Sequence, residues 1–172
     1  MNEPKLVRPK VNKILYGAAA AIVINLGLSI WLTFEYYIQS ENSVCSINAM
    51  FDCVTVAQSE YAVLFGVPVA VWGIIFYTGL LFGVLGVVWR IPFHKILKFL
   101  RPNFVLKLVR LAAYFGLLFS IYLTYIEAFE LHVYCPFCLA QQAFIIVIVG
   151  LLIWANTVIN SGLKETKVCE FC

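Results

Sequence analysis

The chain has 172 residues, of which 63% are hydrophobic and only 12% are charged. Soluble domains carry about 25% charged residues, so this composition excludes an ordinary soluble protein and predicts an integral membrane protein. The formal net charge of +3 is small and gives no reason to expect a nucleic-acid partner.

Four apolar runs are long enough to cross a membrane, which takes roughly 20 apolar residues. A span in lipid must satisfy its own backbone hydrogen bonds, so we expect helices rather than strands. The predicted helices cover about 14–38, 63–89, 104–130 and 136–160. Little sequence remains outside them. The whole chain, 1–172, is therefore predicted to be one domain, an all-α bundle of four transmembrane helices.

The distribution of charge predicts the orientation of this bundle. All twelve lysines and arginines precede the first helix, lie around the connection between the second and third, or follow the fourth. Basic segments stay on the cytoplasmic side, so both termini are expected inside and the loops 35–62 and 127–135 outside. The outer segments carry only acidic charges, and we expect Glu127 and Glu130 to be solvated there rather than to carry protons.

The predicted topology divides the cysteines into two groups. Cys45, Cys53, Cys135 and Cys138 fall on the outer side, where disulfides persist. Cys169 and Cys172 fall on the inner side, where thiols stay reduced. One interpretation is that the outer cysteines form two structural disulfides, each of which holds its own loop.

The position of Cys135-Pro136-Phe137-Cys138 favours a redox centre instead. Proline suits the first turn of a helix, so Cys135 should cap the fourth helix and Cys138 should lie one turn further on the same face. The positive end of the helix dipole favours the thiolate. Cys45 and Cys53 can bridge each other or act as a shuttle, and two neighbouring pairs form a relay through mixed disulfides.

Three features together resemble the vitamin K epoxide reductase family, in its prokaryotic thiol-oxidase form. The first is the Cys-x7-Cys loop with Ser59 six residues later, in Ser-Glu-Tyr-Ala-Val-Leu-Phe-Gly-Val-Pro. The second is Ser-Ile-Tyr-Leu, which ends at Leu123 on the third helix, and the third is Cys-Pro-Phe-Cys at the start of the fourth. The DsbB-type oxidases are similar in architecture but carry their Cys-x-x-Cys in the first outer loop.

The resemblance implies a role for each outer cysteine. Cys138 would lie beside a quinone, with Cys135 as its disulfide partner. Cys53 would attack Cys135, and Cys45 would exchange with an external thioredoxin-like or DsbA-like protein. A thioredoxin-like domain is fused to many bacterial relatives, and because none is expected here, the partner would be a separate protein.

The resemblance also implies a pocket for ubiquinone or menaquinone. Ser59, Tyr61 and Leu123 match positions that bound the quinone. For Ser59 the alternative is a helix cap, and for Tyr61 and Leu123 it is ordinary helix packing. No metal is expected, because the tail Cys-Glu-Phe-Cys, 169–172, lacks the four ligands of a zinc site.

The implied function is a membrane oxidoreductase that supports disulfide formation, in the cell (inner) membrane with its site on the extracytoplasmic face. One alternative is a vitamin K quinone or epoxide reductase, and another is a non-enzymatic protein with structural disulfides. Gln142 and Phe82 stand where a tyrosine and an asparagine of the mammalian enzymes are expected, which argues against epoxide reduction. Gly79 and Gly83 form a GxxxG motif that predicts close packing inside the bundle.

Overall fold

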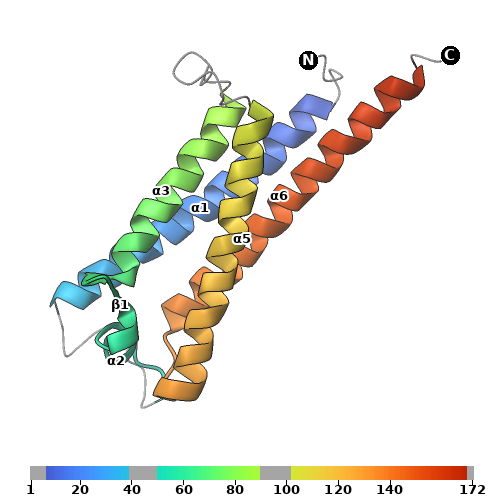
Figure 1. Ribbon diagram of the computed structural model, residues 1–172. Coiled ribbons are helices and arrows are strands. Elements are labelled where there is room, and N and C mark those ends of the chain that lie inside the picture. The colour runs from blue at the N-terminus through green and yellow to red at the C-terminus, as the bar shows by residue number, and fades with distance from the viewer. Residues whose placement is uncertain (1–6, 39–49, 90–101, 170–172) are drawn as a thin grey trace.

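The computed structural model describes residues 7–38, 50–89 and 102–169, and the side chains of 9–38, 50–89 and 104–161. Four long helices dominate it: α1 (Val7–Ile38), α3 (Val69–Val88), α5 (Pro102–Ile126) and α6 (Pro136–Cys169). They run alternately up and down, so α1 begins and α6 ends at the same end of the bundle (Figure 1). Each is long and apolar enough to cross a membrane, which confirms the predicted fold class.

Helices α1 and α6 extend beyond the apolar runs that predicted them. α1 already includes Lys10 and Lys13, and α6 continues to Cys169. Hydropathy locates the hydrocarbon core rather than the helix ends, because long basic side chains can reach the headgroups while the backbone remains helical. The membrane-spanning parts of these two helices nevertheless fall where the sequence predicts them.

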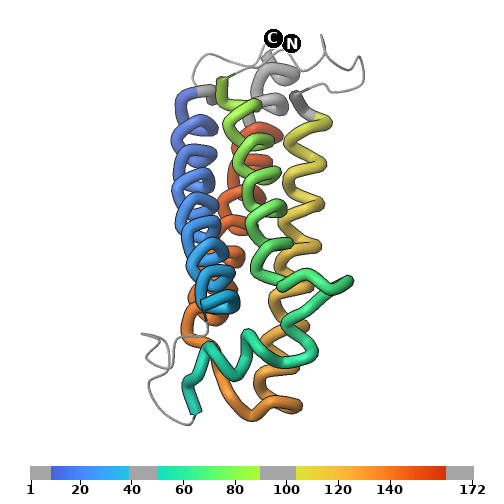
Figure 2. Tube along the Cα trace, turned by 90° about the vertical axis from the view of Figure 1, so that its left-hand side faces the viewer, coloured from blue at the N-terminus to red at the C-terminus, as the bar shows by residue number. Residues whose placement is uncertain are grey.

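Short elements close the end of the bundle at which α1 ends and α6 begins (Figure 2). They are α2 (Cys53–Ala57), the 3₁₀ turn η1 (Glu60–Ala62) and the antiparallel strands β1 (Val63–Leu64) and β2 (Val67–Pro68). The prediction that residues 63–68 are helical is therefore wrong. Phe65 and Gly66 have φ of 54° and 78°, as a tight hairpin turn requires, and Pro68 stands at the N-cap of α3.

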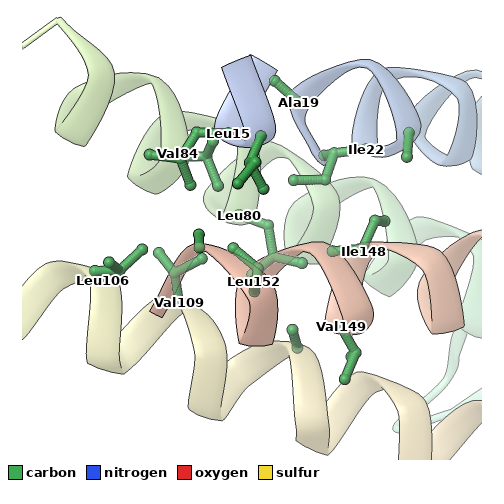
Figure 3. Packing of buried hydrophobic residues seen from close by; sticks show 14 of the residues in the cluster. Leu15, Ala19, Ile22, Leu80, Val84, Leu106, Val109, Ile148, Val149 and Leu152 are labelled. Carbon is green, nitrogen blue, oxygen red and sulfur yellow. The ribbon is translucent and has the colours of Figure 1, made fainter. Parts of the chain in front are cut away.

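The four helices form a ring in which α1 and α5 each pack against α3 and α6. Figure 3 shows the core between them, to which all four helices contribute. Leu15 and Ile22 of α1 meet Val84 of α3 and Leu152 of α6 there, all fully buried. Many large apolar side chains face outward instead, among them Phe115, Leu118 and Trp154. Lipid is the solvent in which such an outer surface is stable.

Gly83 confirms the internal packing predicted from the GxxxG motif, since a Cβ there would overlap a methyl group of Val109 on α5. A Cβ at Gly79 would meet nothing within 4 Å.

We therefore expect Gly83→Ala to destabilise the bundle by about 1–3 kcal/mol, as overpacking does. Gly79→Ala is the matched control and should be neutral or stabilising, since alanine has the better helix propensity. Denaturant unfolding in detergent micelles measures both, and equal stabilities would contradict the packing argument.

Candidate active site

Two segments that are far apart in sequence are joined by backbone hydrogen bonds just before the cysteines. The N–H of Asp52 donates to the carbonyl of Tyr134 at 3.1 Å, and the N–H of Tyr134 donates to the carbonyl of Met50 at 2.9 Å. The rings of Phe51 and Tyr134 pack with their centroids 6.1 Å apart. These contacts hold the residue before Cys53 against the residue before Cys135.

Cys53 is the first residue of the short helix α2, whose N-terminus is capped by Asp52. The Asp52 carboxylate accepts hydrogen bonds from the N–H of Val54 at 3.0 Å and from the hydroxyl of Thr55 at 2.6 Å. Such capping satisfies helix donors that would otherwise lack partners. It fixes Cys53 in the interior, where the residue is 1% exposed and engaged in a disulfide. The predicted partner, Cys45, lies outside the described residues.

Cys135 caps α6 as its position in the sequence predicts. Its sulfur accepts a hydrogen bond from the N–H of Cys138 at 3.2 Å, and its carbonyl accepts from the N–H of Leu139 at 3.0 Å. Both Cys135 and Cys138 are free thiols in this structure. The Cys135 sulfur thus provides a partner for one of the N–H groups at the start of α6 that have none within the helix.

The sulfurs of Cys53 and Cys135 are 3.1 Å apart. Both residues are 1% exposed and lie in a small apolar cluster with Leu32, against which Phe137 and Cys138 pack. The structure thus combines an oxidised Cys53 with a reduced Cys135 in direct contact. Thiol–disulfide exchange between two cysteine pairs requires such proximity, because a sulfur of one pair must reach a sulfur of the other.

A cavity of about 340 Å³ opens beside this sulfur pair, between all four long helices and α2. Its size is within the range of small-molecule sites, and its lining is mostly apolar. The cavity brings together every predicted site residue that the structure describes: Cys53, Ser59, Tyr61, Leu123, Cys135 and Cys138. Ser59 is the N-cap residue of η1, but its hydroxyl makes no capping bond and donates instead to the carbonyl of Val56 at 2.8 Å. The alternative prediction, a side chain that caps a helix, is therefore not what the hydroxyl does.

The inner part of the cavity contains polar groups that sequence reasoning missed. The side-chain amide of Gln141 donates to the hydroxyl of Ser29 at 2.7 Å and to the carbonyl of Asn25 at 3.2 Å, which ties α6 to α1. The side-chain amide of Asn25 in turn donates a hydrogen bond to the backbone carbonyl of Gln141 at 3.3 Å. Gln141 lies three residues after Cys138 on the same helix face, so that spacing was the available signal.

Glu127 is a second residue whose role the sequence did not reveal. It begins a π-helical turn, η2 (Glu127–Leu131), is only 3% exposed and lines the cavity. Its carboxylate accepts the N–H of Cys135 at 3.2 Å and is within electrostatic range of the Cys138 thiol. The prediction of a solvated charge is wrong for Glu127, whereas Glu130 is indeed exposed.

A comparison with models of protein families matches residues 16–153 to the vitamin K epoxide reductase family. The match covers most of the chain, from within α1 to well inside α6. The chain belongs to the vitamin K epoxide reductase family. Members of this family are membrane oxidoreductases that in general use quinones. A comparison with individually curated proteins found no match.

The residues that the sequence analysis compared with mammalian members of the vitamin K epoxide reductase family occupy different environments. Gln142 accepts a short hydrogen bond from the hydroxyl of Thr124, which itself lines the cavity. Phe82 is 62% exposed and borders a separate groove between α3 and α5. Gln142 is therefore close enough to the cavity to influence which ligand binds there, whereas Phe82 lies away from the cavity and does not bear on epoxide reduction.

Proposed function

We propose that this protein oxidises a thioredoxin-like or DsbA-like protein outside the membrane and passes the electrons to a membrane quinone, which supports disulfide formation. The observation that carries the proposal is the 3.1 Å contact between the sulfur of Cys53, already in a disulfide, and the free sulfur of Cys135. Cys138 follows one turn later and lines a mostly apolar cavity. Two cysteine pairs and a cavity in contact form a path in which each step involves neighbouring groups.

In this scheme the partner protein reduces the pair that Cys53 forms with Cys45. Cys53 then exchanges with the Cys135–Cys138 disulfide by attack on Cys135, the sulfur that it touches. Cys138 is left as the reduced sulfur that faces the cavity. Membership in a quinone-using family, together with a mostly apolar cavity of suitable size, supports a quinone as the ligand.

A quinone supplies the two-electron acceptor that such a relay needs. A partner as oxidising as DsbA, at about −120 mV, is regenerated only by an acceptor of higher potential, and each 30 mV is worth about 1.4 kcal/mol for two electrons. The cavity residues Tyr61 and Leu123 would bound the ring of this quinone, whether ubiquinone or menaquinone. The proposed location is the cell (inner) membrane, with the cysteine relay on the extracytoplasmic face, as the positive-inside rule predicts.

The experiment that tests this function uses purified protein, a reduced thioredoxin-like or DsbA-like protein and a short-chain ubiquinone. We expect loss of quinone absorbance at the rate at which disulfide appears in the partner. Vitamin K epoxide, offered in place of the quinone, separates an epoxide reductase from a thiol oxidase. Absence of turnover with both acceptors would favour a non-enzymatic protein with structural disulfides.

The external partner should be trapped by a Cys53→Ala variant. Without Cys53, Cys45 cannot resolve an intermolecular bond, so a mixed disulfide with the partner should accumulate and appear on non-reducing gels. The Cys45→Ala/Cys53→Ala double variant is the matched control and should give no adduct. If cells that express the candidate partner contain no adduct with the single variant, a separate thioredoxin-like partner is the wrong assignment.

A further inference from the structure

We infer that Glu127 is a catalytic acid and base of the cysteine relay: it protonates Cys138 when that sulfur leaves a disulfide and takes the proton back when Cys138 is reoxidised. This inference rests on the proposed function and deepens it, because it assigns a proton carrier to the same site. The cysteines alone can exchange electrons, but the sulfur that leaves departs as a thiolate, and a thiolate in an apolar interior is unfavourable unless a nearby acid protonates it.

The position of Glu127 suits this role. Its carboxylate accepts the N–H of Cys135 at 3.2 Å and lies close enough to the Cys138 thiol to interact with it electrostatically. It is 3% exposed and borders the cavity, so it acts where bulk water does not supply protons freely. A carboxyl group can accept the Cys135 N–H when charged and donate to a sulfur when neutral.

Among the described residues, none forms an ion pair with Glu127 that would assign it a purely structural role. Among the side chains that the structure describes, the lysines and arginines lie toward the other end of α1 and α5: Lys10, Lys13, Lys107 and Arg110. His132 is nearer but exposed, and its ring bonds to the carbonyl of Ala128. A carboxylate buried without a cation is an unfavourable structural element, and such groups are typical of functional sites.

The local backbone explains how an acidic residue near a helix end becomes buried. Glu127 opens the π-helical turn η2, which follows α5 directly and ends at His132 with φ of 54°. A π turn inserts one extra residue and changes the direction of the side chains, and such turns occur frequently at functional sites. Glu130, three residues later in the same turn, remains exposed.

The exchange step balances with groups that are all present in the chain. The Cys53 thiolate attacks the sulfur of Cys135, so the Cys53–Cys135 bond forms and the Cys135–Cys138 bond breaks. The electron pair of the broken bond goes to Cys138, which takes the proton of the Glu127 carboxyl group and leaves a carboxylate. No net oxidation occurs in this step. When the quinone of the proposed function later oxidises Cys138, it would accept the two electrons, and the carboxylate would take the proton of the thiol.

The exchange can be measured without quinone in the purified protein. The fully oxidised protein is mixed with dithiothreitol and quenched with acid, and alkylation followed by mass spectrometry gives the rate at which Cys138 becomes free. Glu127→Gln keeps the size and the acceptor for the Cys135 N–H but cannot donate an acidic proton. We expect about a hundredfold slower release of Cys138, since acid–base catalysis contributes roughly 10²–10⁴-fold.

Three further variants make the test decisive. Glu130→Gln removes an exposed carboxylate from the same turn and should stay within about twofold of the wild type. Glu127→Asp keeps an acid with shorter reach and should be faster than Glu127→Gln. Glu127→Ala should be slow but regain rate when formate is added, which a merely structural role would not produce.

The outcomes separate this inference from the proposed function. A Glu127→Gln rate equal to that of the wild type, or a slow rate that neither aspartate nor formate restores, would overturn the acid–base role and leave the relay intact. If the wild-type protein itself never releases Cys138 after reduction of the Cys53 disulfide, the relay is wrong. If Glu127→Gln does not fold, the aspartate and alanine variants still decide the question.

Discussion

Replacing Cys138 with alanine is expected to stop electron transfer to quinone and to leave a disulfide between Cys53 and Cys135. The sulfurs of Cys53 and Cys135 are already 3.1 Å apart, so their bond can form without rearrangement of the fold. Without Cys138 nothing on the cavity side can resolve that bond. Mass spectrometry of peptides prepared without reductant detects the cross-link, and the absorbance of a short-chain ubiquinone reports the transfer.

The other cysteines provide the controls for this result. Alanine at Cys45, Cys53 or Cys135 should also reduce transfer to background, because each supplies a sulfur that the relay needs. Cys169→Ala and Cys172→Ala should leave transfer unchanged, since the predicted topology places both on the opposite side of the membrane. Quinone reduction at the normal rate by Cys138→Ala would contradict the relay, and loss of activity in a tail variant would contradict the assignment of the pairs.

Replacing Leu123 with glutamate is expected to abolish quinone reduction while exchange with the external partner continues. Leu123 lines the cavity but is absent from the apolar cluster around Cys53 and Cys135. An uncompensated buried charge costs about 3–5 kcal/mol, which corresponds to at least a hundredfold weaker binding of an apolar ligand.

Two measurements on the same preparation test the Leu123 prediction. Titration with a short-chain ubiquinone gives the affinity, and alkylation of the cysteines after addition of reduced partner gives the exchange rate. Leu123→Met is the matched control, because it conserves volume and should change either quantity only slightly. An unchanged quinone affinity in Leu123→Glu would show that the quinone binds elsewhere. An equal loss of both activities would point to a general disruption of the fold.

The helices were predictable because hydropathy responds directly to the lipid environment, and the four spans fall where apolar runs of sufficient length occur. The hairpin at 63–68 was not, because Val63, Leu64 and Val67 are as apolar as the helix that follows. Its turn depends on the positive φ of Phe65 and Gly66. Of these two residue types, only glycine indicates such a conformation in a sequence. Proline at 68 was the available signal for the true start of α3.

The site was predictable as a set of residues but not as a geometry. The resemblance named Ser59, Tyr61, Leu123 and the cysteines, and the structure places those that it describes around one cavity. The burial of Glu127 depends on a π turn, which no periodicity in the sequence indicates. The contact between Cys53 and Cys135 depends on the backbone bonds around Tyr134, which join segments about 80 residues apart and are invisible to local patterns.

In the proposed relay, the near-complete burial of Cys53 and Cys135 would also determine which molecules can compete for their electrons. A small soluble thiol that diffuses to the protein meets neither sulfur while the bonds around Tyr134 hold, so it cannot bypass the outermost cysteine of the path. The same barrier would keep electrons of the proposed relay from returning to unrelated disulfides. Electrons would then enter only from the water-exposed side and leave only on the lipid side. The selectivity for the correct partner would come from the packing of Leu32 and Phe137 around the sulfurs rather than from the redox potentials of the cysteines.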